Sequence, residues 1–172
     1  MTQALKLFRE AANYYHYTMA YNFIGEIYLQ QCNYKWAYSW YLKAAKDGDA
    51  EGNCMIGYIY DIGLWLSRDE EVAYSYYAKA ADTNDFDVIT ALALRFQIGK
   101  NIQKEEEVAA NIFEVIAERG DMLAQYRIGL CYLNGLGRER NKEIALKWLG
   151  KAIKQGCEEA KEALKDVRSL KE

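Results

Sequence analysis

The sequence predicts an all-α fold, a right-handed solenoid built from stacked helix-turn-helix repeats. Two ladders of residues carry this prediction, and both repeat every 36 positions. In the first ladder a small residue precedes an aromatic one by three positions, as at Gly57, Ala93 and Gly129. In the second ladder an alanine opens the related segments AYSYYAKAA, AANIFEVIA and ALKWLGKAI, at Ala73, Ala109 and Ala145. Two independent ladders with one period indicate structural repeats that stack on one another.

The second-ladder segments also have the period of an α-helix. In AYSWYLKAA, Ala37, Trp40, Tyr41 and Ala44 fall at i, i+3, i+4 and i+7, which is one face of a helix. The small residues of both ladders are predicted to make room where the two helices of a repeat cross. A single repeat cannot bury both faces of its helix pair, so neighbouring repeats must stack.

Helix ends are predicted from capping residues. Gly48, Gly120 and Gly156 are expected to end second helices in the left-handed conformation, with Asn84 in the equivalent place. The expected N-caps of second helices are Asp69 and Asn141, with Glu105 as a weaker one. These boundaries divide a single domain, 1–172, into a partial repeat (1–16), a shorter repeat (17–48), three full repeats (49–84, 85–120 and 121–156) and a C-terminal capping helix (157–172).

The segment QYRIGLCYLNGLGRERNKEIALKWLGKAIKQG (125–156), with both Gly135 and Gly137 in its loop, resembles a Sel1-like repeat of the tetratricopeptide superfamily. Residues 52–84 resemble it too, except that Trp65 replaces the second loop glycine. The 85–120 repeat is degenerate, with Ala93 and Asn101 at the two glycine positions.

The first full repeat departs from this pattern in its loop. From Gly25 to Ala37 is 12 residues, against 16 from Gly57 to Ala73, and 12 is the spacing of an ordinary tetratricopeptide repeat. The resemblance as a whole implies a non-enzymatic adaptor or scaffold, of a family whose members are often bacterial.

Composition excludes several partners. The formal net charge of −3 provides no basic field for nucleic acid, which is not expected as a partner. No apolar run approaches the roughly 20 residues that span a bilayer, so no membrane insertion is expected. Charges at Lys6, Arg9 and Glu10 stand where a signal peptide needs an apolar segment, which predicts a cytoplasmic protein. The chain starts in mid-repeat, which leaves open a fragment of a longer or exported protein.

The sequence contains few residues in patterns that suit catalysis. His16 is the one histidine, in the segment NYYHY, and it is expected to be a partly exposed turn or capping residue. No nucleophile, phosphate-binding or HExxH motif is present, so no catalytic residue, cofactor or metal site is predicted. The cysteines, at 32, 54, 131 and 157, form no CxxC pair and are expected to be reduced and half-buried. The run KEEEV (104–108) is expected to be a solvated helix start.

A partner-binding strip is predicted on the concave face of the first helices. Positions −6, −3, +1 and +4 from the small residue lie opposite the second helix, and the nominated residues are Asn22, Glu26, Glu51, Tyr58, Asp61, Thr90, Leu94, Gln97, Leu123, Tyr126, Leu130 and Leu133. Tyrosines off the ladders, among them Tyr21, Tyr58 and Tyr126, are expected to reach the surface. The expected partner is a protein or peptide with some positive charge.

Three alternatives stay open. The leucines of the last repeat can be covered by the C-terminal helix instead of facing a partner. The resemblance also extends to cysteine-rich Sel1-like proteins to which β-lactam binding or hydrolysis has been ascribed, so an enzyme is the first competing function. The second is a self-assembling structural module joined through the N-terminal partial repeat.

Overall fold

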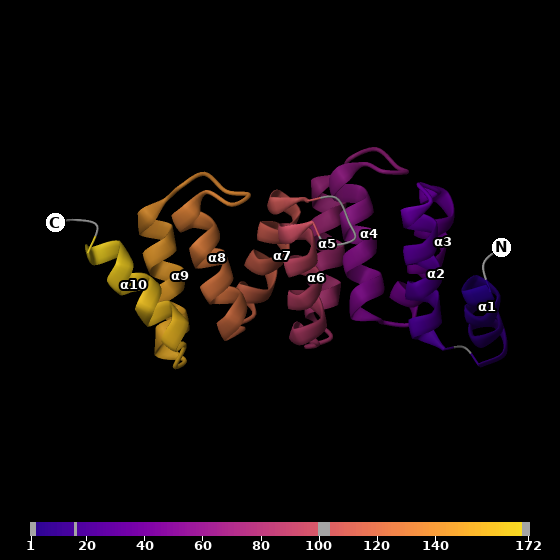
Figure 1. Ribbon diagram of the computed structural model, residues 1–172, viewed down its shortest axis with the longest axis horizontal. Coiled ribbons are helices and arrows are strands. Elements are labelled where there is room, and N and C mark those ends of the chain that lie inside the picture. The colour runs from indigo at the N-terminus through magenta and orange to yellow at the C-terminus, as the bar shows by residue number, and fades with distance from the viewer. Residues whose placement is uncertain (1–2, 16, 100–103, 170–172) are drawn as a thin grey trace. The chain divides into compact units, whose positions relative to one another are not determined.

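The computed structural model describes residues 3–15, 17–99 and 104–169, and these residues form ten α-helices with no strand (Figure 1). The predicted all-α fold is therefore confirmed. In chain order the helices are α1 (Gln3–Tyr15), α2 (Thr18–Gln30), α3 (Tyr34–Lys46), α4 (Ala50–Ile62), α5 (Glu70–Ala81), α6 (Phe86–Ile98), α7 (Glu106–Glu118), α8 (Met122–Asn134), α9 (Lys142–Lys154) and α10 (Glu158–Ser169).

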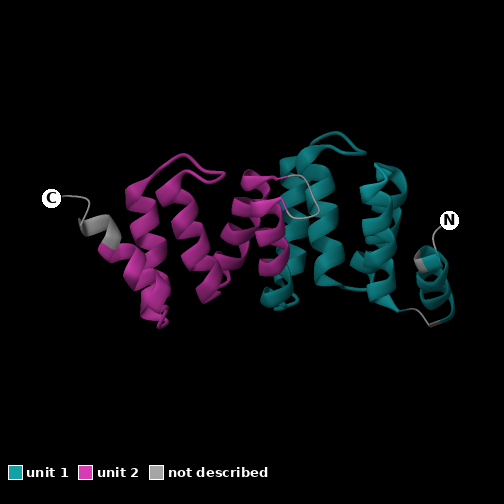
Figure 2. Ribbon diagram, in the orientation of Figure 1, with its two compact units in different colours: residues 1–89 teal, residues 90–172 magenta. Residues whose placement is uncertain are grey.

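The helices form two compact units, residues 1–89 and residues 90–172 (Figure 2). In unit 1, α1 packs on α2, α2 on α3, α3 on α4, and α4 on α5. In unit 2, α7 packs on α8, α8 on α9, and α9 on α10. Within each unit these helices thus pack mainly on their neighbours in sequence, as expected for repeats that bury their apolar faces by stacking.

The small residues of the first ladder lie where the helices of a repeat cross. A Cβ atom on Gly57 would lie 2.5 Å from the Tyr77 ring, which is 1% exposed and cannot move aside. A Cβ atom on Gly129 would lie 2.9 Å from the Leu149 side chain. The predicted role of these glycines in making room at the crossing is therefore confirmed.

The predicted helix ends are also confirmed. Gly48, Gly120 and Gly156 have φ angles of 81°, 97° and 97°, and Asn84 has a φ of 60°. Backbone N–H groups donate to the Asp69 and Asn141 side chains, as expected of N-caps, whereas Glu105 accepts no such bond.

A second set of N-caps, not predicted from the sequence, lies at the starts of first helices. The Oδ1 atom of Asp49 accepts a hydrogen bond from the N–H of Gly52, and that of Asp121 accepts one from Ala124, both at 2.6 Å. The Asp49 Oδ1 atom also accepts a bond of 2.7 Å from the Asn22 amide of the preceding repeat. The signal was visible as Asp directly after a helix-ending glycine.

The turn inside the first full repeat is shorter than its counterparts. Residues 31–33 join α2 to α3, whereas residues 63–69 join α4 to α5 and residues 135–141 join α8 to α9. Within the short turn, Cys32 has a φ of 56°, a conformation that glycine takes more easily. The short turn and the longer α4–α5 loop form one end of unit 1, where the candidate site lies.

Candidate functional site

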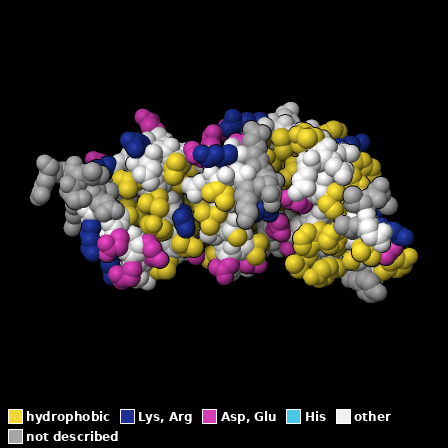
Figure 3. Space-filling view, viewed as in Figure 1, with side chains coloured by type: hydrophobic (Ala, Val, Ile, Leu, Met, Phe, Trp, Pro, Cys, Tyr) yellow, Lys and Arg dark blue, Asp and Glu magenta, His cyan; other side chains and the backbone are white. Residues whose placement is uncertain are grey.

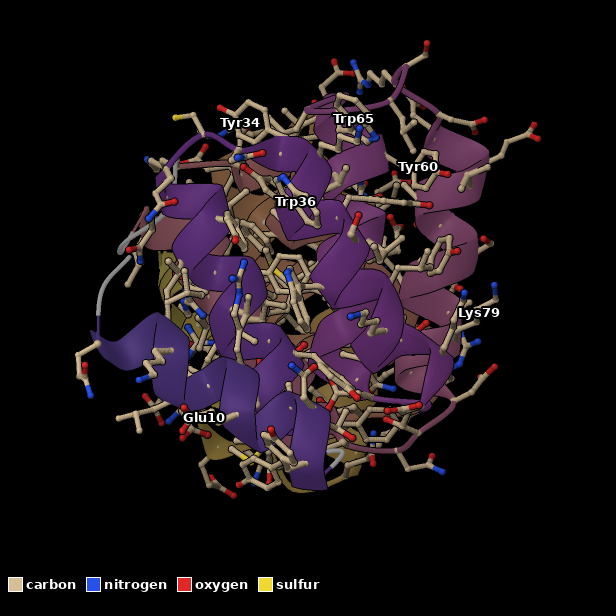
Figure 4. All side chains as sticks on the ribbon, turned by 90° about the vertical axis from the view of Figure 1, so that its right-hand side faces the viewer. Glu10, Tyr34, Trp36, Tyr60, Trp65 and Lys79 are labelled. Atoms are coloured by element: carbon tan, nitrogen blue, oxygen red, sulfur yellow. The ribbon has the colours of Figure 1, made fainter. Side chains whose placement is uncertain are left out.

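Aromatic side chains gather at the end of unit 1 that carries the α2–α3 turn and the α4–α5 loop. Figure 4 shows Tyr34, Trp36, Tyr60 and Trp65 together at this end. Trp36, on α3, is 50% exposed, and Trp65, in the loop, is 47% exposed. We call the following set the aromatic surface: Trp36, Tyr38, Tyr60, Trp65 and Tyr76.

Ring contacts across four helices hold this surface in place. The Tyr60 ring of α4 lies 6.2 Å from that of Tyr38 on α3, edge to face, and 6.1 Å from that of Tyr76 on α5, where the two rings stack. The Trp36 ring stacks at 6.1 Å on Tyr28 of α2. These separations lie within the favourable range for aromatic pairs. The rings of Trp36, Tyr38, Tyr60 and Tyr76 are therefore restrained before any partner binds, which lowers the entropic cost of binding.

Two lysines add positive charge to the aromatic surface. The Lys35 Nζ atom lies 5.7 Å from the centroid of the Trp65 ring, and the Lys79 Nζ atom lies 4.3 Å from that of Tyr76. Both distances fit cation–π interactions. Figure 3 shows that hydrophobic side chains gather over unit 1 on the face in view.

The exposure of Trp65 follows from its place in the loop. The equivalent residue in the last repeat is Gly137. It lies so close to α7, the second helix of the repeat before, that a Cβ atom would be 2.0 Å from the carbonyl oxygen of Glu106. A side chain cannot enter such a contact. In its repeat, Trp65 instead lies over Lys35, in the first turn of the preceding second helix, and half of its ring stays exposed.

Tyr38 and Tyr76 of the aromatic surface are hydrogen-bond donors at neutral pH. Burial raises the pKa of Tyr38 far above its usual range, and a hydrogen bond with Tyr60 adds to this effect. Burial also raises the pKa of Tyr76. Both hydroxyls therefore stay protonated and can act with the indole N–H groups in polar recognition.

Four of the strip residues nominated from the sequence are buried, so the open position expected for them was wrong: Asn22, Tyr58, Asp61 and Thr90, at 2–5% exposed. Their side chains serve packing between helices. The Asp61 carboxylate accepts a bond of 3.0 Å from the buried Tyr77 hydroxyl, and the Asn22 amide donates to Asp49. Tyr21, at 8% exposed, is also buried, contrary to its expected place at the surface.

The other eight strip residues keep some accessible surface. Leu123 is 39% exposed, and the remaining ones are half-buried, namely Glu26, Glu51, Leu94, Gln97, Tyr126, Leu130 and Leu133. Tyr126 packs against a buried cluster that α9 and α10 build, whose members are Leu149, Ala152, Cys157 and Ala160. The C-terminal helix therefore contributes to covering Tyr126, while Leu123 stays open.

The four cysteines differ in exposure more than expected. Cys54, Cys131 and Cys157 are buried and Cys32 is exposed, so the half-buried environment expected for all four was wrong. All four are free thiols. Burial raises the pKa of Cys131 to about 11 and that of Cys54 still further. A raised pKa disfavours the thiolate, which is the reactive form.

We expect one thiol to react quickly with Ellman's reagent at pH 8. Cys32 is accessible, whereas the buried thiols need local unfolding before they can react. The variant Cys32→Ser is expected to lose the fast phase and to keep the slow one. A fast phase that survives in Cys32→Ser would show that a thiol from the interior is accessible in the native protein.

Among the described residues, no group of three or more His, Cys, Asp or Glu side chains is placed to hold a metal ion. His16 lies outside the described residues, as does Asn101. The segment 104–108 starts α7 as predicted, with Glu106 and Glu107 in its first turn. No helix in the described part of the chain has the length and apolar character needed to cross a bilayer.

Paired helices that stack in sequence order, crossing glycines and capped repeat boundaries define an α-solenoid repeat protein. The Sel1 repeat family model matches residues 1–13, 15–49, 50–85 and 123–157. The chain therefore belongs to the Sel1 repeat family, whose repeats are generally protein-interaction modules. The unmatched segment between 85 and 123 contains the repeat in which Ala93 replaces the crossing glycine.

Solved structures with the same fold support this assignment. A Sel1 repeat protein from Oxalobacter formigenes matches with a TM-score of 0.52 and 23% identity, over 95% of this chain and 48% of that one. A protective antigen of uropathogenic Escherichia coli strains, with an SLR fold, matches with a TM-score of 0.52 and 27% identity, over 92% of this chain and 35% of that one. The chain thus spans about half or less of the length of these relatives. A search of curated protein sequences gives no match.

Proposed function

We propose that the protein is a non-enzymatic interaction module that binds a protein or peptide partner through the aromatic surface of unit 1. The observation that carries this proposal is the pair of exposed indoles, Trp36 and Trp65, on a pre-ordered set of rings. Tryptophan and tyrosine are enriched at the centres of protein interfaces, because they combine a large apolar area with a hydrogen-bond donor. Exposed apolar residues that are contiguous mark interaction sites more often than scattered ones do.

The first-helix strip supports binding less well than the aromatic surface does. Four of its members are buried, and only Leu123 exposes more than a third of its surface. Replacing Tyr58, which is 3% exposed, would remove a ring from the interior and disturb the fold. A peptide that lies along the first helices would therefore contact mainly the strip residues of unit 2, and we regard this as the second candidate surface for the same function.

Trp36→Ala/Trp65→Ala is the variant that tests the proposal. We expect affinity capture from an extract of the source cell, followed by quantitative mass spectrometry, to show at least a tenfold loss of the partner that the wild-type chain retains. The physical reason is that truncating a single interface tryptophan commonly costs about 2 kcal/mol or more of binding free energy. The variant should stay folded by far-UV circular dichroism, with a lower melting temperature, because about half of each tryptophan residue is buried.

A matched control removes two aromatic rings elsewhere in unit 1. Tyr14 and Tyr17 are 78% and 51% exposed and lie outside the aromatic surface. The variant Tyr14→Ala/Tyr17→Ala should retain the partner. If both double variants retain it equally, the aromatic surface is not the binding site. If only the control loses it, binding takes place near Tyr14 and Tyr17, where α1 meets α2.

A further inference from the structure

Helix α9 has a groove on its exposed face that is separate from the aromatic surface. The groove has a volume of about 530 Å³, and its apolar walls come from Ile144, Leu146 and Trp148. The Leu146 side chain is 37% exposed. A Cβ atom on Gly150 would meet nothing within 4 Å, so no part of the described chain fills the space above this glycine. A side chain from another molecule can therefore enter the groove beside Leu146.

Three lysines line the same groove and make it locally basic. Lys147, Lys151 and Lys154 are exposed, and their spacing of four and three residues places them on one face of α9. None of them forms an ion pair with another described residue, although the Lys151 Nζ atom lies 3.8 Å from the centroid of the Trp148 ring. The charge is notable in a chain whose net charge is −3.

Acidic residues of the next helix leave this positive charge uncompensated. On α10, the carboxylates of Glu158 and Glu162 form ion pairs with Lys161 and Lys165 of their own helix, at 2.5 Å and 2.7 Å. Within α9 itself, Glu143 is the one acidic residue against four lysines, and it lies in the first turn, away from the centre of the groove. The groove therefore combines apolar walls with a positive rim.

We propose that the groove of α9 binds a short acidic, amphipathic segment of a partner protein. An apolar side chain of the segment enters the space over Gly150, beside Leu146. Carboxylates on either side of it pair with Lys147, Lys151 and Lys154. The apolar contact supplies affinity by burial, and the lysines supply orientation and a fast association rate.

The dimensions of the groove favour a short segment. Lys147 and Lys154 are seven positions apart, which at 1.5 Å per residue is about 10 Å along the helix axis. In an extended peptide, which rises about 3.3 Å per residue, side chains four positions apart lie on one face about 13 Å apart, a span that flexible lysine side chains can bridge. The volume of about 530 Å³ falls within the range of roughly 300–1,000 Å³ that is typical of sites for small ligands. One apolar anchor between two carboxylates matches this space.

The experiment measures binding of a fluorescein-labelled peptide with the repeating pattern Glu-Ser-Leu-Ser, which places leucine and its flanking glutamates on one face, by fluorescence anisotropy with the full chain. The variant Lys147→Glu/Lys151→Glu is expected to weaken binding at least tenfold, because both charges then repel the peptide. The control Lys6→Glu/Lys46→Glu makes the same change in net charge at exposed lysines of unit 1, and it should weaken binding less than twofold. Circular dichroism melts of both variants should match the wild type.

Two comparison ligands separate this proposal from its competitors. A peptide of the same length in which serine replaces each leucine should bind at least fivefold more weakly, since it lacks the apolar anchor. If the serine peptide binds equally well, the peptide is held by general electrostatic attraction, and the proposal of an apolar anchor in the groove is wrong. If the chain binds phosphatidylserine vesicles but not the leucine peptide, the groove binds a membrane surface, and the proposal of a protein partner is wrong. Equal effects of the two lysine variants would also overturn the proposal. Because the aromatic surface takes no part in any of these measurements, their outcome is independent of the proposed function.

Discussion

Replacing Gly137 with alanine is expected to lower the free energy of unfolding by about 3 kcal/mol or more. Two effects act together at this position. The φ angle of 67° is strained for any residue with a Cβ atom, and that Cβ atom would lie 2.0 Å from the carbonyl oxygen of Glu106. Because the neighbour is backbone at the start of α7, the loop itself would have to move away. Urea unfolding followed by far-UV circular dichroism measures the effect.

Gly156→Ala is the matched control for this prediction. Gly156 has a φ of 97°, but a Cβ atom there would meet nothing within 4 Å. Its replacement therefore introduces the backbone strain without the collision, and we expect a loss of about 1 kcal/mol. If the two variants are equally stable, the close approach of the α8–α9 loop to α7 does not contribute to stability.

The second large effect is expected for Glu114→Ala, at about 2–3 kcal/mol of unfolding free energy. The Glu114 carboxylate accepts hydrogen bonds from Arg138, at 2.7 Å, and from the Tyr132 hydroxyl, at 3.0 Å. The two charged side chains are only 16% and 21% exposed. Without Glu114, the Arg138 guanidinium keeps its bond to Asn111 but loses its countercharge in a poorly solvated place. Urea unfolding of the wild type and of Glu114→Ala under the same conditions measures the difference in unfolding free energy.

Glu158→Ala removes a glutamate from an exposed ion pair and controls for this loss. The carboxylate of Glu158 pairs with Lys161 one turn away, and its side chain is 73% exposed. Exposed pairs of this kind contribute little because water and salt screen them, so stability should change by less than about 0.5 kcal/mol. A similar loss in both variants would mean that the Glu114–Arg138 pair behaves as an ordinary surface pair.

Features that depend on local backbone chemistry, or that recur with the repeat, were predictable from the sequence. The crossing glycines, the left-handed residues that end second helices and the side-chain caps at Asp69 and Asn141 all lie where the pattern placed them. The helix ends and caps are determined by the residue type and its immediate neighbours, whereas the crossing glycines contact the second helix and were predicted from the repeat. A period of 36 residues then sets the spacing of these signals along the chain.

Exposure was harder to predict, because it depends on packing between helices. A helical wheel places Tyr58 and Asp61 opposite the second helix, yet both are buried. Asp61 is held there by a hydrogen bond from Tyr77, a residue that the wheel of α4 cannot include. The two exposed indoles were missed for the opposite reason. Trp65 stood out in the sequence as a departure from the repeat pattern, and that departure was the signal of an exposed side chain.

The glycine–aspartate pairs at Gly48–Asp49 and Gly120–Asp121 give a repeat its own stop and start signal within two residues. A block of sequence between such pairs can be duplicated or deleted in evolution while the neighbouring helices keep their own capping residues. The N-cap Asp49 adds one condition, because its Oδ1 atom also accepts from Asn22 in the preceding repeat. A newly inserted repeat at that junction would need an amide at the same place to complete the cap of its successor.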